Sequence, residues 1–134
     1  MTIESFGEFK LIDRIRSRIR EDGKDVVIGP GDDCAAIRPA DNTLSLLSTD
    51  TFVEGLDFSS DYSTWRQVGW KAMAANLSDI AAMGGSPRYV LVTLCLPATV
   101  ALETVDALCD GMMDLAAEHG VSIIGGDLSG TSGP

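Results

Sequence analysis

The chain has 134 residues, of which 45% are hydrophobic, and its 20 acidic and 10 basic residues give a formal net charge of −10. The apolar fraction suits one globular domain with a core of its own and excludes a disordered tail. The negative charge argues against nucleic-acid binding through a basic surface, and no apolar run approaches the roughly 18 residues that a membrane helix needs.

The first elements predicted along the chain are a helix and a hairpin. Apolar residues recur at helical spacing after the capping box Ser5-Phe6-Gly7-Glu8 and predict an amphipathic helix over residues 6–21. Two short apolar runs, Cys34–Arg38 and Leu44–Ser48, flank the turn 39–42 and predict a β-hairpin. Residues 51–63, which contain "TFVEGLDF", are expected to be irregular.

The second half of the chain alternates between helix and strand. Each predicted helix is followed by glycine, and the strand "RYVLVTLCL" is apolar enough to be buried on both faces. The elements are a helix over Trp65–Met83, a strand over Arg88–Leu96, a helix over Thr99–His119 with Thr99 as its cap, and a strand over Val121–Ile124. This order predicts a single α+β domain over residues 1–134, with a four-stranded mixed sheet and helices packed on one face.

Cysteine usage and the N-terminus indicate a cellular compartment. Three cysteines lie in apolar runs without a CxxC pair, which predicts buried, reduced thiols. The N-terminus lacks the basic start and apolar segment of a signal peptide, so we expect a cytoplasmic protein. The single histidine cannot build a multi-histidine zinc site, which argues against a zinc enzyme.

Aspartates stand at the ends of four predicted elements, each beside small residues. Carboxylates brought together from separate elements repel each other unless a multivalent cation lies between them. Mg²⁺ is the candidate because it prefers oxygen ligands and is held by a few carboxylates, waters and substrate phosphates. For any one of these residues, capping a turn or ending a strand is the competing interpretation. The residues are Asp32 and Asp33 before a strand, Asp50 and Asp127 after strands, and Asp79 near a helix end, one turn from Asn76.

Other phosphate or metal motifs do not fit the sequence. The stretch "GPGDD" is not followed by Gly-Lys-Ser/Thr, so it is not a P-loop, and no G-x-G-x-x-G occurs. An EF-hand loop is also missing, and a Ser-His-Asp triad is implausible with His119 at a helix end and no G-x-S-x-G.

Four motifs in order, "GDDCA", "STDTFVEGLDF", "KAMAANLSDIAAMGGSP" and "IIGGDLS", resemble the N-terminal domain of the thiamine-monophosphate kinase family. The resemblance covers nearly the whole chain. It implies the aminoimidazole ribonucleotide synthetase-like fold and transfer of phosphate from ATP to thiamine monophosphate, assisted by several Mg²⁺ ions. It also implies a homodimer, and a C-terminal domain that this chain lacks, so we expect the chain alone to be inactive.

The resemblance also assigns roles to individual residues. Gly126 and Asp127 would line the ATP phosphates, and Asp32 would support the glycine loop or the second ligand shell. Asp57 would contact the substrate, although the family has a histidine at this place in "VEG-x-H-F" where this chain reads "VEGLDF". The implied magnesium ligands are Asp33, Ser48, Thr49, Asp50, Asp79 and Asp127.

Two other interpretations remain open. Another ATP-using member of the superfamily, such as selenophosphate synthetase, shares the aspartate arrangement but needs a reactive cysteine or selenocysteine near its N-terminus. Cys34 instead follows the paired aspartates and is predicted to lie inside a strand. A non-catalytic dimerisation domain whose aspartates only cap turns is the alternative from a different class.

Overall fold

The computed structural model describes residues 25–28, 33–39 and 43–131. These fall into two compact units, which divide between Ser48 and Thr49. The predicted helix over residues 6–21, its capping box and Asp32 lie outside the described residues.

The first unit contains a three-stranded antiparallel sheet in the order β1-β2-β3. The hairpin predicted from the sequence is confirmed as β2 (Ala35–Ile37) and β3 (Ser45–Leu47), with Ala36 opposite Leu46. The additional strand β1 (Val26–Ile28) runs antiparallel to β2. Cys34 was predicted to lie inside a strand, but it directly precedes β2; it and Ala36 of β2 are buried.

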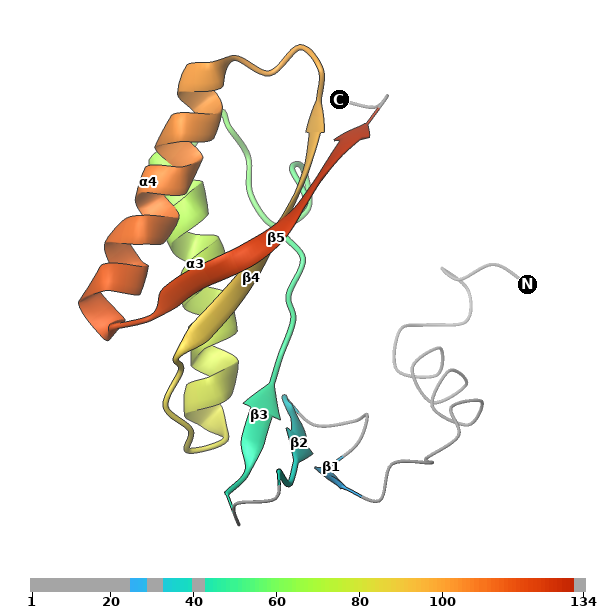
Figure 1. Cartoon of the computed structure of the whole chain (residues 1–134). Coiled ribbons are helices and arrows are strands. Elements are labelled where there is room, and N and C mark those ends of the chain that lie inside the picture. Colours follow the sequence, from blue (N-terminus) through green and yellow to red (C-terminus); the bar gives the residue numbers. More distant parts are fainter. Residues whose placement is uncertain (1–24, 29–32, 40–42, 132–134) are drawn as a thin grey trace. The chain divides into compact units, whose positions relative to one another are not determined.

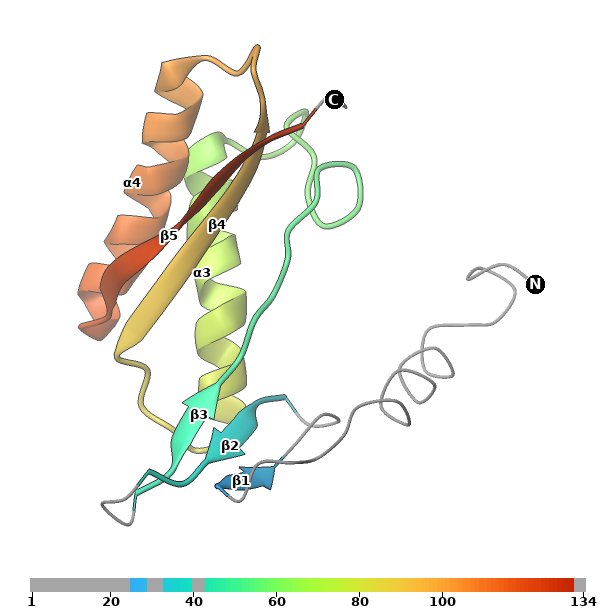
Figure 2. The same cartoon turned by 45° about the vertical axis from the view of Figure 1, so that its right-hand side comes forward.

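The second unit packs two helices on one face of a parallel strand pair (Figures 1 and 2). It consists of α3 (Trp65–Ala82), β4 (Tyr89–Pro97), α4 (Leu102–His119) and β5 (Ser122–Thr131). Helices on one face were predicted, but a single four-stranded sheet was not the outcome. The described strands form separate three- and two-stranded sheets, because the hairpin takes β1 as its third strand and β4 pairs with β5.

The core of the second unit lies between the helices and the inward face of β4. Its buried residues come mainly from α4, with Val68 and Met73 from α3, and Val90, Val92 and Leu94 of β4 pack against them. The buried residues of α4 are Leu108, Gly111, Met112, Leu115 and Ala116.

The two helices approach so closely that backbone meets backbone. A Cβ atom added to Gly69 of α3 would lie 2.0 Å from the carbonyl oxygen of Leu108. One added to Gly111 of α4 would lie 1.9 Å from the carbonyl oxygen of Arg66. Each helix thus contributes a glycine at its crossing with the other, and neither position has room for a side chain.

The ends of both helices follow local chemistry. Thr64 and Gln67 form a reciprocal capping box at the start of α3, and Gly84, at φ +70°, follows its end. Gly120 ends α4 in the left-handed region, as predicted. Thr99 was wrong as the cap of α4, because the chain first makes a turn in which Val100 N–H donates to Pro97 O, and the cap is Ala101.

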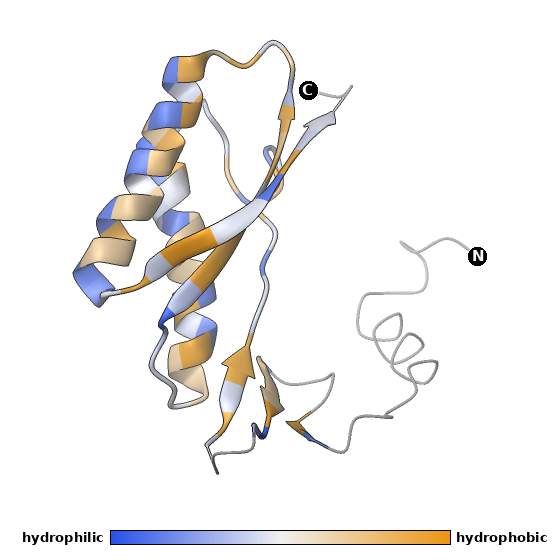
Figure 3. Cartoon of the chain, in the orientation of Figure 1, coloured by the Kyte–Doolittle hydropathy of each residue, from blue (hydrophilic) through white to orange (hydrophobic). Residues whose placement is uncertain are grey.

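Strand β4 is not buried on both faces, as its apolar sequence had predicted. Tyr89 and Leu91 are each 68% exposed, whereas the residues that alternate with them face the helices. Ile124 of β5 is also exposed, and Figure 3 shows apolar residues along both strands. The helices cover one face of this pair, and the open face displays apolar side chains.

The expectation of buried thiols holds for part of the set. Cys34 is buried and Cys109 half-buried, but Cys95 lies on the open face of β4 and is exposed. All three are free cysteines. Within the described residues, no helix combines the length and the apolar character needed to cross a membrane.

Candidate functional site

The segment that follows β3 is held in a tight turn beside α3. Leu56 N–H and Asp57 N–H both donate to Val53 O, at 3.1 and 2.9 Å, and Gly55 N–H donates to Phe58 O at 2.8 Å. Gly55 has φ +84°, a left-handed conformation that suits glycine. The irregular segment expected from "TFVEGLDF" is therefore an ordered turn stabilised by its own backbone.

The side chain of Asp57 closes this turn. One of its carboxylate oxygens accepts the N–H of Val53 at 2.8 Å. Lys71 of α3 donates from Nζ to the backbone carbonyl oxygen of Asp57 at 2.9 Å, and the same ammonium group lies 5.4 Å from the centroid of the Phe52 ring. Asp57 and Lys71 together fasten the turn to the helix. Sequence patterns gave Lys71 no role, although it lies two helical turns before Asp79 on α3.

Asp50 lies at the start of the same segment and is attached to α3 by Asn76. Its backbone N–H donates to Asn76 Oδ1 at 3.1 Å. Burial, and then the carboxylates of Asp79 and Asp57, raise the pKa of the Asp50 carboxyl group above its usual value. The carboxylates of Asp79 and Asp57 thus both act on Asp50, together with its burial.

These acidic groups have the chemistry that Mg²⁺ requires. Asp79 lies in the last turn of α3, where the negative end of the helix dipole adds to the repulsion between the carboxylates. A divalent cation would relieve that repulsion, and Mg²⁺ commonly takes one or two carboxylates and completes its shell with water and phosphate oxygens. Among the described residues, no group of three or more His, Cys, Asp or Glu is placed to hold a metal ion by itself. An ion beside these carboxylates would therefore need further ligands, such as water or phosphate oxygens.

Two of the predicted ligands lie together in the first unit. Ser48 Oγ donates to the backbone carbonyl oxygen of Asp33 at 3.2 Å, across the space between the start of β2 and the end of β3. The hairpin thus brings the two residues together, as expected for residues that flank neighbouring strand ends.

Asp127 was predicted to follow a strand, but it lies within one. Strand β5 continues through Gly125 and Gly126 to Thr131, and Asp127 is opposite Thr93 of β4. Its carboxylate accepts a hydrogen bond from Ser129 Oγ at 3.0 Å. Within the described residues, its charge is not among the causes of the Asp50 shift, so Asp127 is a separate carboxylate on the sheet.

Gly126 permits the close approach of β4 and β5. A Cβ atom at this position would lie 1.8 Å from the carbonyl oxygen of Val92. Gly126 and Asp127 also border an apolar hollow of about 490 Å³ between β5 and α4, lined in addition by Met112, Met113 and Leu128. The glycine therefore has a structural reason independent of any ligand.

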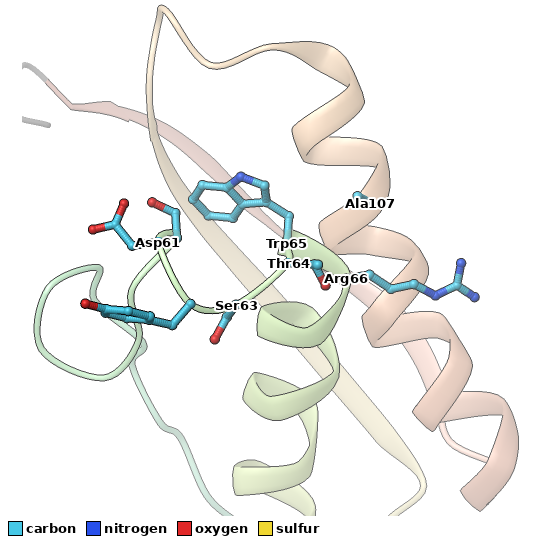
Figure 4. Close-up of a pocket in the computed structure, with 8 residues that line it drawn as sticks. Asp61, Ser63, Thr64, Trp65, Arg66 and Ala107 are labelled. Carbon is cyan, nitrogen blue, oxygen red and sulfur yellow. The ribbon is translucent and has the colours of Figure 1, made fainter.

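A second hollow, of about 560 Å³, lies at the start of α3 (Figure 4). Its residues run from Ser60 to Arg66 with Ala107, and Trp65 packs edge-to-face on Phe58 with the ring centroids 5.7 Å apart. In Figure 4 Arg66 reaches across α4, where it donates from Nε to Asp114 at 2.8 Å. None of the predicted ligands lines this hollow.

Comparison with known proteins bears on these observations. The family model described as AIR synthase related protein, N-terminal domain, matches residues 31–134. The chain belongs to this family. Its match to the family begins at the glycine loop and includes every predicted site residue from Asp33 to Asp127.

Individual relatives of this chain are named thiamine-monophosphate kinase. Thiamine-monophosphate kinase of Rhodopirellula baltica is 42% identical over 116 residues, which cover 81% of this chain and 37% of that protein. The enzyme of the same name from Bacillus subtilis is 39% identical over 93% of this chain and 38% of its own length. The chain therefore spans less than two fifths of the length of these relatives, and the resemblance stated from the motifs is confirmed.

Solved structures agree with this. A structure described as AaThiL complexed with AMPPCP and TMP superposes on 98% of this chain and 40% of its own with a TM-score of 0.86, at 31% identity. Thiamine-monophosphate kinase from Stenotrophomonas maltophilia covers 93% of this chain with a TM-score of 0.61, at 40% identity.

Proposed function

We propose that this chain is the N-terminal, ATP- and magnesium-binding part of a thiamine-monophosphate kinase. Such an enzyme transfers a phosphoryl group from ATP to thiamine monophosphate and forms thiamine diphosphate. The observation that carries the proposal is the attachment of the Asp50 segment to α3, the helix that bears Asp79, in a chain that superposes closely on AaThiL complexed with AMPPCP and TMP.

The proposed roles follow the chemistry of each side chain. When bound, Mg²⁺ would screen the negative charges of the phosphate groups. Gly126 and Asp127 would lie along the ATP phosphates. The residues proposed to hold the metal ions are Asp33, Ser48, Thr49, Asp50, Asp79 and Asp127.

The acceptor in this reaction makes modest demands on the protein. The nucleophile is a phosphate oxygen that already carries negative charge, so no strong general base is needed. What remains is to hold two anionic substrates close together and in line, which is a matter of positioning and charge. The acidic residues of the chain suit this task through the metal ions they would hold.

Asp57 has a proposed role in the substrate segment. A carboxylate that faced the phosphate of thiamine monophosphate would repel it. In this chain the carboxylate is turned to Val53 N–H and closes its own loop. We therefore assign Asp57 the task of shaping the segment that meets the substrate, with Lys71 holding that segment on α3.

The open face of the β4–β5 pair supports a homodimer. It exposes Tyr89, Leu91 and Ile124, and exposed apolar area of this kind is characteristic of interaction sites. A second copy of the chain could cover it, in agreement with the partner that the motifs imply. The three free cysteines fit a cytoplasmic location.

A dimerisation module without catalytic function is the second candidate. It is favoured by the lack of a complete metal-binding group among the described residues, and by the same exposed sheet face. A selenophosphate synthetase is less well supported, because Cys34 is only 2% exposed.

Calorimetric titration separates the two candidates. The chain should bind Mg²⁺ together with AMPPCP, and Asp79→Asn should weaken that binding by at least about tenfold, because it removes a charged ligand. A dimerisation module would show no metal-dependent nucleotide binding, and Asp79→Asn would change nothing.

Turnover gives a second test of the same proposal. The chain alone should release no ADP from ATP and thiamine monophosphate, since it spans less than two fifths of the length of its relatives. The calorimetric titration described above has its own matched control, Glu118→Ala. Glu118 is an exposed acidic residue in the last turn of α4. The substitution removes one negative charge from the second unit and should leave the titration unchanged.

A further inference from the structure

Asn76 joins the two carboxylate-bearing elements of the second unit. It lies on α3, three residues before Asp79, and its side-chain oxygen accepts the backbone N–H of Asp50 at 3.1 Å. Its side-chain nitrogen donates to the carbonyl oxygen of Ala72, one helical turn earlier, at 3.0 Å. Both halves of the amide are therefore engaged.

The second of these bonds determines which way the amide faces. Because Nδ2 is bound to the helix backbone, Oδ1 is directed outward to the segment that carries Asp50. The side chain is half-buried, where a hydrogen bond meets less competition from water. Asn is well suited to this place, since it offers a donor and an acceptor from one short, rigid group.

Electrostatics explains why such a tie is needed. Asp50 and Asp79 both carry carboxylates, and like charges held near each other repel. Without a restraint, the segment after β3 would relax away from α3 in the absence of a cation. Lys71 restrains the far end of the segment at Asp57, but Asn76 is bound at Asp50 itself.

We infer that Asn76 is a positioning residue for magnesium binding, which holds the Asp50 backbone so that its carboxylate stays beside that of Asp79. The inference deepens the proposed function and rests on Asp50 and Asp79 being metal ligands. Groups that orient a metal ligand commonly account for ten- to a hundredfold in metal affinity. Asn76 would act in this way through the backbone of its ligand, without touching the ion.

The test is a Mg²⁺ titration of the 134-residue chain with two readouts. Calorimetry measures the binding affinity, and NMR of ¹⁵N-labelled protein records the amide resonance of Asp50. Asn76→Ala should weaken Mg²⁺ binding about tenfold and move the Asp50 amide proton upfield, because that proton loses its acceptor. Ser78→Ala is the matched control. Ser78 Oγ also bonds to the backbone of α3, at Ala75 O and 2.9 Å, but it has no tie to the segment after β3 among the bonds described. It should leave both readouts unchanged.

A second variant guards against a simple loss of folding. Asn76→Asp keeps an oxygen acceptor of the same size, so the Asp50 amide resonance should stay near its wild-type position even where Asn76→Ala moves it. If Asn76→Ala binds Mg²⁺ as tightly as wild type, or if the Asp50 amide resonance is the same in all variants, the inference is wrong while the proposed function stands. If the wild-type chain binds no Mg²⁺, both fail together.

Discussion

Asp50 combines a perturbed carboxyl group with a backbone hydrogen bond to α3. Burial and the carboxylates of Asp79 and Asp57 raise the pKa of its carboxyl group. Its backbone N–H donates a hydrogen bond to Asn76 of α3. A folded-state pKa above the unfolded value means that the protonated group favours the fold. That contribution is fully present below the unfolded value of 3.8 and is lost as the pH rises through the higher folded value.

Asp50→Asn should therefore stabilise the metal-free chain at pH 7. The substitution removes a repelling charge, so the melting temperature in EDTA should rise. The gain should shrink as the pH falls through the raised folded pKa and vanish below the unfolded pKa of 3.8. Thermal melts followed by circular dichroism at several pH values would check this. A gain that grew on acidification would show that charge repulsion is not its cause.

Local residue chemistry allowed part of this site to be predicted. The pattern of aspartates next to small residues indicated Asp50 and Asp79, and the carboxylate of Asp79 is one cause of the raised pKa of Asp50. That they hold a metal ion stays a prediction. The tie from Asn76 to a backbone N–H distant in sequence could not be foreseen, since neither residue carries a local signal of the other. The inward turn of the Asp57 side chain was equally hidden, because a carboxylate in a loop can face either solvent or its own backbone.

At the scale of elements, β5 shows where glycine is a misleading signal for a strand end. Two adjacent glycines after "SII" predicted the end of a strand, yet the ladder continues through them for its full length. Helix boundaries were more predictable because caps are local: Gly120 was correct, whereas Thr99 was not, since a turn at Pro97 delays the start of α4. Strand β1 was not predicted, although it is as long as β2 and β3.

The two glycines at 126 and 130 offer a controlled test of strand pairing. Gly126→Ala should destabilise the second unit by roughly 1–3 kcal/mol, because its Cβ would lie 1.8 Å from Val92 O. Gly130→Ala, in the same strand, has no atom within 4 Å of its new Cβ and should be nearly neutral. Urea unfolding of both variants gives the comparison. Equal stabilities would mean that β4 and β5 are not so tightly paired.

At the scale of the whole molecule, the fold class was within reach of the sequence but the exposure of its surfaces was not. The alternation of helices and strands and the four motifs predicted a family that the comparisons bear out. The same apolar run in β4 predicted burial on both faces, whereas the chain supplies helices for one. The hydropathy of a strand indicates that an apolar face is to be covered. It does not indicate whether helices of the same chain or another molecule cover that face.

If a second copy covers that face, one charge placed on it should separate the copies. Leu91→Glu, at a position 68% exposed on β4, should convert the dimer to a monomer in sedimentation velocity experiments. Leu102→Glu, 78% exposed at the start of α4, is the control and should leave the dimer intact. A wild-type chain that stays monomeric at high concentration would contradict the dimer.

The crossing of α3 and α4 has a consequence for how this chain can vary. Gly69 and Gly111 each meet the opposing backbone, so a side chain at either position would push the helices apart or slide one along the other. Asn76 and Asp79 lie on the helix that would move. Gly69 and Gly111 therefore fix the position of α3 and of the Asn76 and Asp79 side chains that it carries. In a saturation library we expect both glycines to tolerate substitution as poorly as the carboxylates do.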